Sequence, residues 1–148
     1  MLYLTKPIQF NPKFEVVSCF VEYNNKILLL LRQDHKPQPN TYRVPAGKKE
    51  TEETILQAIK RELKEESWLL IENNEITYFK EVYVKYDTYD FIYHIFQLNL
   101  NNKPNIQPTI TINEKEHKEF LRTSPEEALD KNLIQDLDTC IQVFYKTP

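Results

Sequence analysis

Three glutamates in the middle of the chain, Glu62, Glu65 and Glu66, have a spacing that could bind a metal ion. At about 100° per residue of an α-helix they span an arc of roughly 100°, so they share one side of the helix. Clustered carboxylate oxygens suit Mg²⁺ or Mn²⁺, which proteins usually bind through a few carboxylates together with substrate phosphates. The three glutamates therefore predict a Mg²⁺ site, with Mn²⁺ possible, and a substrate that carries phosphate.

A solvated helix face is the commoner meaning of a run of charges, and the pairing of the charges decides between the two interpretations. A bare helix is stabilised by opposite charges four residues apart, whereas here Glu62 stands four residues before Glu66. Each like pair costs about 0.2–0.5 kcal/mol. Only Arg61 and Glu65 form an opposite pair at that spacing, so the arrangement is mildly unfavourable until a cation binds.

The glutamates belong to a longer pattern that begins at Gly47, the only glycine of the chain. Five residues separate Gly47 from Glu53, seven more lead to the run Arg61-Glu62-Leu63-Lys64-Glu65-Glu66, and Leu69 follows after two further residues. This pattern resembles the signature of the Nudix hydrolase family, G-x5-E-x7-R-E-U-x-E-E-x-G-U with U aliphatic. Chance would produce such a match on the order of once in a million sequences. One position differs, because Trp68 replaces the second glycine of the signature.

The resemblance implies an α/β fold, a Nudix-like α/β/α sandwich in which a mixed sheet lies between helices. It also implies metal-dependent hydrolysis of a pyrophosphate bond in a nucleoside diphosphate derivative. The small size of the chain favours a small nucleotide such as a nucleoside triphosphate, oxidised ones included, ahead of sugar nucleotides and dinucleoside polyphosphates. One alternative is a catalytically impaired module that binds a nucleotide without cleaving it. Another is metal-dependent isomerisation.

The resemblance also assigns roles to individual residues. It implies that Glu65 and Glu66 bind metal and that Glu62 binds metal or accepts a proton from the attacking water. Arg61 would pair with Glu53 and brace the loop against the helix. Two further metal ligands are implied by the resemblance. One is the backbone carbonyl of Ala46, just before the motif glycine, and the other is an acid of a later loop, for which Glu116 is preferred over Glu114.

Residues that could bind the substrate flank the acidic helix in sequence. With one glycine the chain cannot build a phosphate-binding loop of the Walker or dinucleotide type, so metal ions and side chains must hold the phosphates. We expect Lys48, Arg43 and Arg32 to do so. Tyrosines on strands could stack on a base but more often belong to the core, and the candidates are Tyr42, Tyr83 and Tyr93.

Trp68 marks the point where the chain leaves the predicted helix. The family glycine permits a left-handed exit, which costs a residue with a Cβ about 1–2 kcal/mol. We therefore expect a different exit from the helix here, and we expect Trp68 to be a buried anchor rather than a substrate platform.

Patterns of apolar residues predict the elements that must position these side chains. The signature helix should run from a cap at Thr51 to about Ser67, with Glu52 and Glu53 in its first turn and an apolar stripe against the sheet. Residues 1–13 should form an N-terminal arm. Two hairpins are predicted, one from strands at 14–23 and 26–32 joined at Asn24-Asn25, and one from strands at 76–86 and 89–100 joined near Asp87-Thr88. A further strand is predicted at 120–122. One helix should begin after Ser124, and another should span about 134–144.

The bulk properties of the chain bound its class. Its 148 residues predict a single domain over residues 1–148, and the net charge of −3 provides no field that would attract nucleic acid. Neither a membrane-spanning run nor a signal peptide is present, and Cys19 and Cys140 suit a reducing compartment, so we expect a cytoplasmic protein. The expected partner is a small nucleotide, and the resemblance implies a possible homodimer.

Overall fold

Two antiparallel hairpins form the centre of the structure, a computed structural model that describes residues 1–72, 75–102 and 110–147. The first hairpin joins β2 (Pro12–Tyr23) to β3 (Lys26–Arg32), and the second joins β6 (Ile76–Lys85) to β7 (Asp90–Asn99). At the first turn Asn24 and Asn25 have φ angles of 52° and 63°, which a tight hairpin turn requires and asparagine tolerates. Both predicted hairpins are confirmed.

The two hairpins are joined into one mixed sheet because β2 pairs in parallel with β7. Across this sheet the order is β1-β6-β7-β2-β3-β4, while β5 pairs with β2 and β8 with β3. The remaining strands are β1 (Leu2–Tyr3), β4 (Tyr42–Arg43), β5 (Ala46–Lys48) and β8 (His117–Thr123). The expected arm thus contributes Leu2 and Tyr3 to the sheet edge beside β6, and the last strand is longer than the predicted 120–122.

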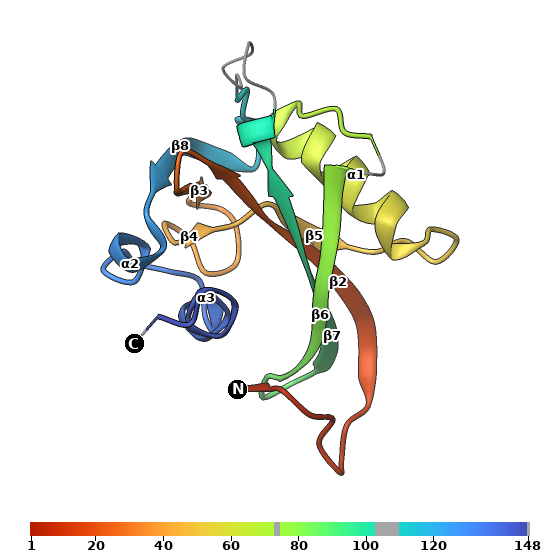
Figure 1. Ribbon diagram of the computed structural model, residues 1–148. Coiled ribbons are helices and arrows are strands. Elements are labelled where there is room, and N and C mark those ends of the chain that lie inside the picture. Colours follow the sequence, from red (N-terminus) through yellow and green to blue (C-terminus); the bar gives the residue numbers. More distant parts are fainter. Residues whose placement is uncertain (73–74, 103–109, 148) are drawn as a thin grey trace.

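Helices cover both faces of the sheet (Figure 1). On one face lies α1 (Ile55–Ser67), whose Ile59 and Leu63 are fully buried in a core with alternate residues of β2. On the other face α3 (Leu137–Tyr145) buries Leu137 and Ile141 against Phe20 and its neighbours, next to the single-turn α2 (Pro125–Ala128). Because side chains of a strand alternate between faces, one sheet supplies two cores. The predicted α/β/α sandwich is confirmed.

The start of α1 differs from the sequence prediction. Thr54, rather than Thr51, caps the helix: its hydroxyl accepts a hydrogen bond from the Gln57 amide at 3.1 Å, and the Gln57 side chain accepts one from the Thr54 amide at 2.9 Å. This reciprocal capping box satisfies two backbone donors at once, which outweighs the single cap expected at Thr51. Consequently Glu52 and Glu53 precede the helix instead of forming its first turn.

The end of α1 also differs from the prediction. Trp68 adopts a left-handed conformation, with φ of 60° and ψ of 21°, and its amide donates to the carbonyl of Lys64 at 3.0 Å. The backbone thus leaves the helix as a glycine would, because the cap hydrogen bond offsets part of the steric cost. The side chain is 63% exposed, so the expectation of a buried anchor is wrong.

No helix in the described ranges is long and apolar enough to cross a membrane.

Candidate active site

The single glycine lies in β5, where the backbone passes directly over the carboxyl group of Glu62. A Cβ at Gly47 would lie 2.1 Å from the Glu62 Cδ and 2.2 Å from its Oε1, which is far inside van der Waals contact. Gly47 does not have a positive φ. The position therefore requires glycine for its lack of a side chain rather than for its backbone freedom.

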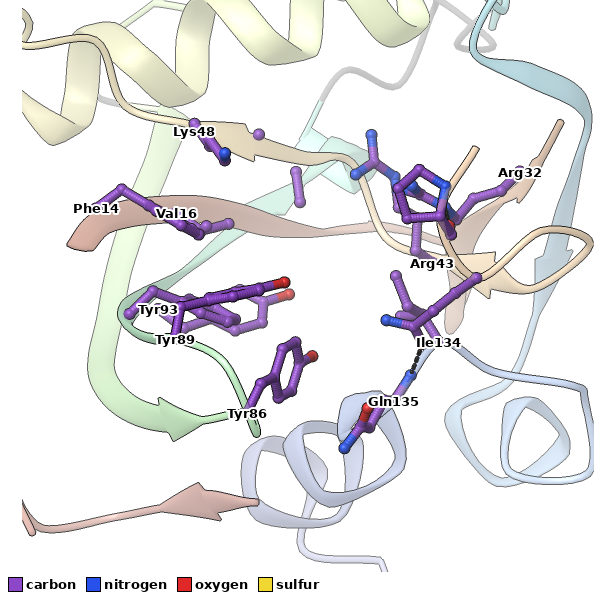
Figure 2. Close-up of a pocket in the computed structure, with 15 residues that line it drawn as sticks. Phe14, Val16, Arg32, Arg43, Lys48, Tyr86, Tyr89, Tyr93, Ile134 and Gln135 are labelled. Atoms are coloured by element: carbon purple, nitrogen blue, oxygen red, sulfur yellow. Dashed lines mark hydrogen bonds between the residues drawn. The ribbon is translucent and has the colours of Figure 1, made fainter. Parts of the chain in front are cut away.

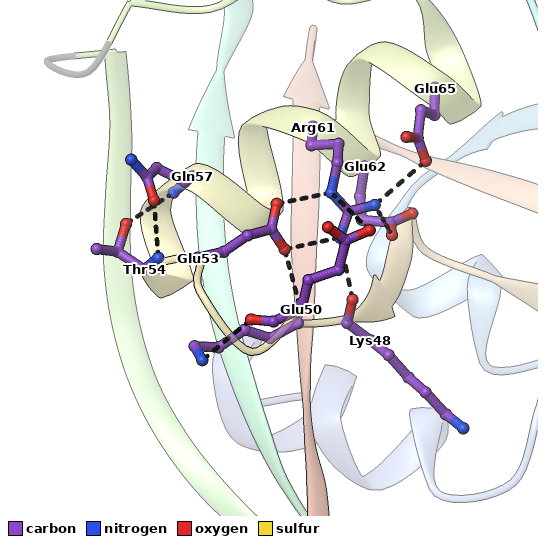
Figure 3. Close-up of polar contacts among 9 residues, drawn as sticks. Lys48, Glu50, Glu53, Thr54, Gln57, Arg61, Glu62 and Glu65 are labelled. Carbon is purple, nitrogen blue, oxygen red and sulfur yellow. Dashed lines mark hydrogen bonds and ion pairs between the residues drawn. The ribbon is translucent and has the colours of Figure 1, made fainter.

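Arg61 connects this loop to the acidic helix (Figure 3). Its guanidinium donates to both carboxylate oxygens of Glu53, at 2.7 and 2.9 Å, and to the backbone carbonyl of Lys48 at 3.1 Å. It also donates to Glu62 at 2.7 Å and to Glu65 at 3.3 Å. The hydrogen bonds from Arg61 lower the pKa of Glu53 to about 2, so Glu53 is ionised at neutral pH. The expected pair of Arg61 and Glu53 is present.

A second arginine binds the glutamate at the end of the signature. Arg43 Nη2 lies 2.5 Å from the Glu66 Oε1, and the amide of Ala46 donates to Glu66 Oε2 at 3.2 Å. Arg43 Nε donates in turn to His117 Nε2 at 3.1 Å. Burial, with the charge of Arg43 beside it, lowers the pKa of His117 to about 3, so this imidazole is neutral and accepts from Arg43.

The signature glutamates have the chemistry of a hard divalent cation site. Glu62 and Glu66 are buried, and burial raises the pKa of both carboxyl groups, whereas the Glu65 side chain is about half exposed. A divalent cation would offset the cost of burying these charges. Among the residues that the structure describes, no group of three or more acidic, His or Cys side chains is arranged to hold a metal ion, and Arg43 and Arg61 form ion pairs with Glu66 and Glu62. Carboxylate oxygens are the donors that Mg²⁺ and Mn²⁺ prefer.

The acidic chamber, a cavity of about 370 Å³, lies beside these glutamates. Its walls combine acids with basic side chains that could meet phosphates. The acids are Glu62, Glu65, Glu66 and Glu116, the basic residues are Arg32, Lys36, Arg43 and Lys48, and Pro37, Ala46, Gly47 and Asn113 also line the chamber. It thus brings together the sequence candidates for metal and substrate binding, while Glu53 and Arg61 lie behind it as a brace. Glu116 pairs with Lys36 at 2.5 Å, and Lys36 holds the pKa of Glu116 below its usual range.

The aromatic cleft, a second cavity of about 500 Å³, opens from the same wall (Figure 2). The two cavities share six lining residues, which are Arg32, Pro37, Arg43, Ala46, Gly47 and Lys48. The aromatic residues of the cleft are Phe14, Tyr86, Tyr89, Phe91 and Tyr93. Such a cavity is within the usual size of a small-molecule site and offers flat apolar surfaces to a planar group.

Among the aromatic residues that line this cleft, the sequence predicted only Tyr93 as a candidate for base stacking. Tyr42 and Tyr83 lie elsewhere: Tyr42 donates to Glu119 at 3.0 Å, and Tyr83 packs edge-on against Phe10. The alternation of Phe91 with Tyr93 along β7 was a usable signal for a shared face. Nothing in the sequence indicated that Phe14 of β2 would stack on Phe91, with ring centroids 5.3 Å apart.

Comparisons with known proteins agree with this fold and with the sequence pattern. The model of the NUDIX domain family matches residues 12–144. The solution structure of the Escherichia coli ORF135 protein is 26% identical, with a TM-score of 0.69, covering 90% of this chain and 89% of that one. No curated protein sequence matches significantly.

Two further solved structures share the fold. The MutT protein of Methanosarcina mazei Go1 is 17% identical, with a TM-score of 0.76 and coverage of 95% of this chain and 97% of that one. A bifunctional NMN adenylyltransferase/ADP ribose pyrophosphatase of Francisella tularensis, in complex with AMP and a Mn ion, is 24% identical with a TM-score of 0.73. The match covers 93% of this chain but 42% of that longer protein.

Proposed function

The chain belongs to the Nudix hydrolase family, whose members are pyrophosphohydrolases that use divalent metals, and on this premise we propose that it hydrolyses a pyrophosphate bond of a nucleoside polyphosphate with Mg²⁺. Nucleoside triphosphates, oxidised ones included, are small members of this substrate class. Mn²⁺ has the same preference for oxygen ligands and is the alternative ion.

One observation carries the proposal: the aromatic cleft and the acidic chamber share a wall of basic residues. A base in the cleft would stack among tyrosines while its phosphates pass Arg32 and Lys48 toward the glutamates. Burial raises the pKa of Tyr86 to about 12 and raises that of Tyr93 further, so both hydroxyls stay protonated at neutral pH and can donate to a base edge. An aromatic pocket, a cationic wall and an acidic end match the three parts of a nucleotide.

The residues of the chamber divide the chemistry between them. Glu62, Glu65, Glu66, Glu116 and the carbonyl of Ala46 would hold the metal, which when bound supplies hydroxide at neutral pH and offsets the negative charge on the leaving oxygen. Glu62 would accept the proton of the attacking water, and burial raises the pKa of its carboxyl group above the ordinary value of a glutamate, which makes it a stronger base. Arg61 and Glu53 would keep that carboxylate in position.

In this proposal Arg43 can bind either Glu66 or a phosphate of the substrate. Arg43 neutralises Glu66, at 2.5 Å, and donates a hydrogen bond to His117, which orients the guanidinium from the other side. When a cation takes over Glu66, the guanidinium is free to bind a phosphate, for which its planar pair of donors is suited. Arg43 would thus bind the substrate once a cation balances the charge of Glu66.

The test is hydrolysis of a panel of nucleotides with Mg²⁺, with Mn²⁺ and with a chelator. We expect release of phosphate or pyrophosphate that the chelator abolishes. Glu65→Gln and Glu66→Gln should each lower kcat/KM by more than the roughly 10–100-fold typical of residues behind the ligands. Glu52→Gln, at an exposed position before the helix, is the matched control and should retain full activity.

The alternative is a module that binds nucleotides without cleaving them. Nucleotide binding by the wild type without turnover across the whole panel would establish that function and refute the hydrolase. Exit from α1 in the glycine-like conformation keeps Glu66 on the face of Glu62, which removes the main structural reason for that alternative.

A further inference from the structure

Trp68 combines two features that each cost stability. Its left-handed backbone costs a residue with a Cβ about 1–2 kcal/mol relative to glycine. Its indole is 63% exposed, so the side chain returns little of that cost through burial. Strained backbone conformations cluster at functional sites, so the left-handed conformation makes the exposed Trp68 a candidate binding position.

An open groove begins at this tryptophan. The groove has a volume of about 720 Å³, and its walls include Trp68, Lys64 and Lys115. Glu65 and Asn113 line both this groove and the acidic chamber, so the two adjoin at these residues. The groove shares no lining residue with the aromatic cleft.

We propose that the Trp68 groove binds a second aromatic base, so that the preferred substrate is a polyphosphate with a nucleoside at each end. This inference rests on the proposed function and names the substrate class of the same site. One base would stack in the aromatic cleft, the phosphates would cross the chamber, and the second base would stack on Trp68. Lys64 and Lys115 line the groove beside that tryptophan and could meet the last phosphates of the chain, although Glu65 and Glu114 line it as well. A single-base nucleotide reaches no further than the chamber.

Fluorescence tests the contact directly, because Trp68 is the only tryptophan of the chain. Diadenosine tetraphosphate is titrated with Mg²⁺ into the Glu62→Gln variant, which slows turnover, with excitation at the red edge of the indole band where adenine does not absorb. We expect it to quench the emission at saturation. ATP and ADP-ribose should bind, as calorimetry reports, without comparable quenching. Equal quenching by ADP-ribose, or none by diadenosine tetraphosphate at saturation, would overturn the second-base site.

Kinetics of Trp68 variants give an independent readout. Trp68→Gly removes the platform and relieves the backbone strain, so a loss of function cannot be attributed to unfolding. We expect the ratio of kcat/KM for diadenosine tetraphosphate to that for ATP to fall roughly 5- to 100-fold, as for the loss of one base stack. Trp68→Phe should restore most of this ratio. Leu70→Ala is the matched control, since Leu70 is 72% exposed and lines no part of the groove.

Failure of this inference is distinguishable from failure of the proposed function. If the wild type hydrolyses ATP but the ratio is unchanged in Trp68→Gly, the second-base site is wrong and the hydrolase stands. If the wild type hydrolyses no nucleotide while diadenosine tetraphosphate still quenches Trp68, the hydrolase is wrong and the binding site stands. A protein that binds neither nucleotide refutes both.

Discussion

Replacing the single glycine by alanine tests how closely β5 and α1 are fitted at the site. The added Cβ of Gly47→Ala would lie 2.1 Å from the Glu62 Cδ, whereas ordinary contact begins near 3.4 Å. The Glu62 carboxyl group must therefore retreat by more than about 1 Å. Glu62 is buried and bound by Arg61 at 2.7 Å, so it cannot move without losing that hydrogen bond.

The expected cost follows from the groups that move. Losing or stretching a charged hydrogen bond costs about 1.5–3 kcal/mol, and alanine in place of glycine returns about 0.4–1 kcal/mol through the unfolded chain. We expect a net loss of about 1–2 kcal/mol in the free energy of unfolding. A general base displaced by about 1 Å should lower kcat about 100-fold.

Urea denaturation and steady-state hydrolysis measure these two effects, and a double-mutant cycle identifies their cause. In the Glu62→Ala background the clashing carboxyl group is absent, so Gly47→Ala should no longer destabilise and should instead stabilise by about 0.4–1 kcal/mol. The same destabilisation in both backgrounds would show that the clash with Glu62 is not the reason for glycine at this position.

Three further predictions concern stability. Arg61 depresses the pKa of Glu53 from 4.5 in the unfolded chain to about 2, so the contribution of this ion pair to the free energy of unfolding is fully present above pH 4.5 and is lost toward pH 2. In urea denaturation the difference in the free energy of unfolding between wild type and Glu53→Gln should therefore shrink from about 1–2 kcal/mol near pH 7 toward zero over that window. A difference that does not change with pH would contradict the pairing. Thr54→Ala should cost about 1 kcal/mol by loss of the N-cap, whereas Thr51→Ala should be nearly neutral; equal effects would disprove the cap assignment. Trp68→Gly should raise the Tm and Trp68→Ala should not, because only glycine relieves the left-handed backbone; a lower Tm for the glycine variant would contradict that strain.

Local pattern in the sequence was sufficient for the sandwich and for the acidic helix. Alternation along β2 and the helical stripe containing Ile59 and Leu63 report burial directly, since a strand has a period of two and a helix one of 3.6. The turn at Asn24-Asn25 is readable because few residues tolerate its conformation. Periodicity and turn preference depend on residues that are neighbours in the chain, so they can be read from a single sequence.

Competition between local signals explains the errors at the two ends of α1. Thr51 and Thr54 are both possible caps, and the reciprocal bond with Gln57 selects the second. At Trp68 the sequence shows only that a left-handed backbone is costly. It does not show that the cap hydrogen bond to Lys64 makes the cost acceptable, or that the indole remains exposed.

Tertiary structure alone decided what surrounds the glutamates. The sequence by itself determined that Glu62, Glu65 and Glu66 share a helix face and that Gly47 belongs with them. Folding decided that Arg43 reaches Glu66 across 23 positions and that the Gly47 backbone lies over Glu62. It also assembled the aromatic cleft from β2, β7 and the turn between β6 and β7, and left Trp68 beside Glu65 in a groove of its own. The physical reason is that these contacts join segments far apart in the chain, and their distances depend on the packing of the sheet and helices rather than on any local preference.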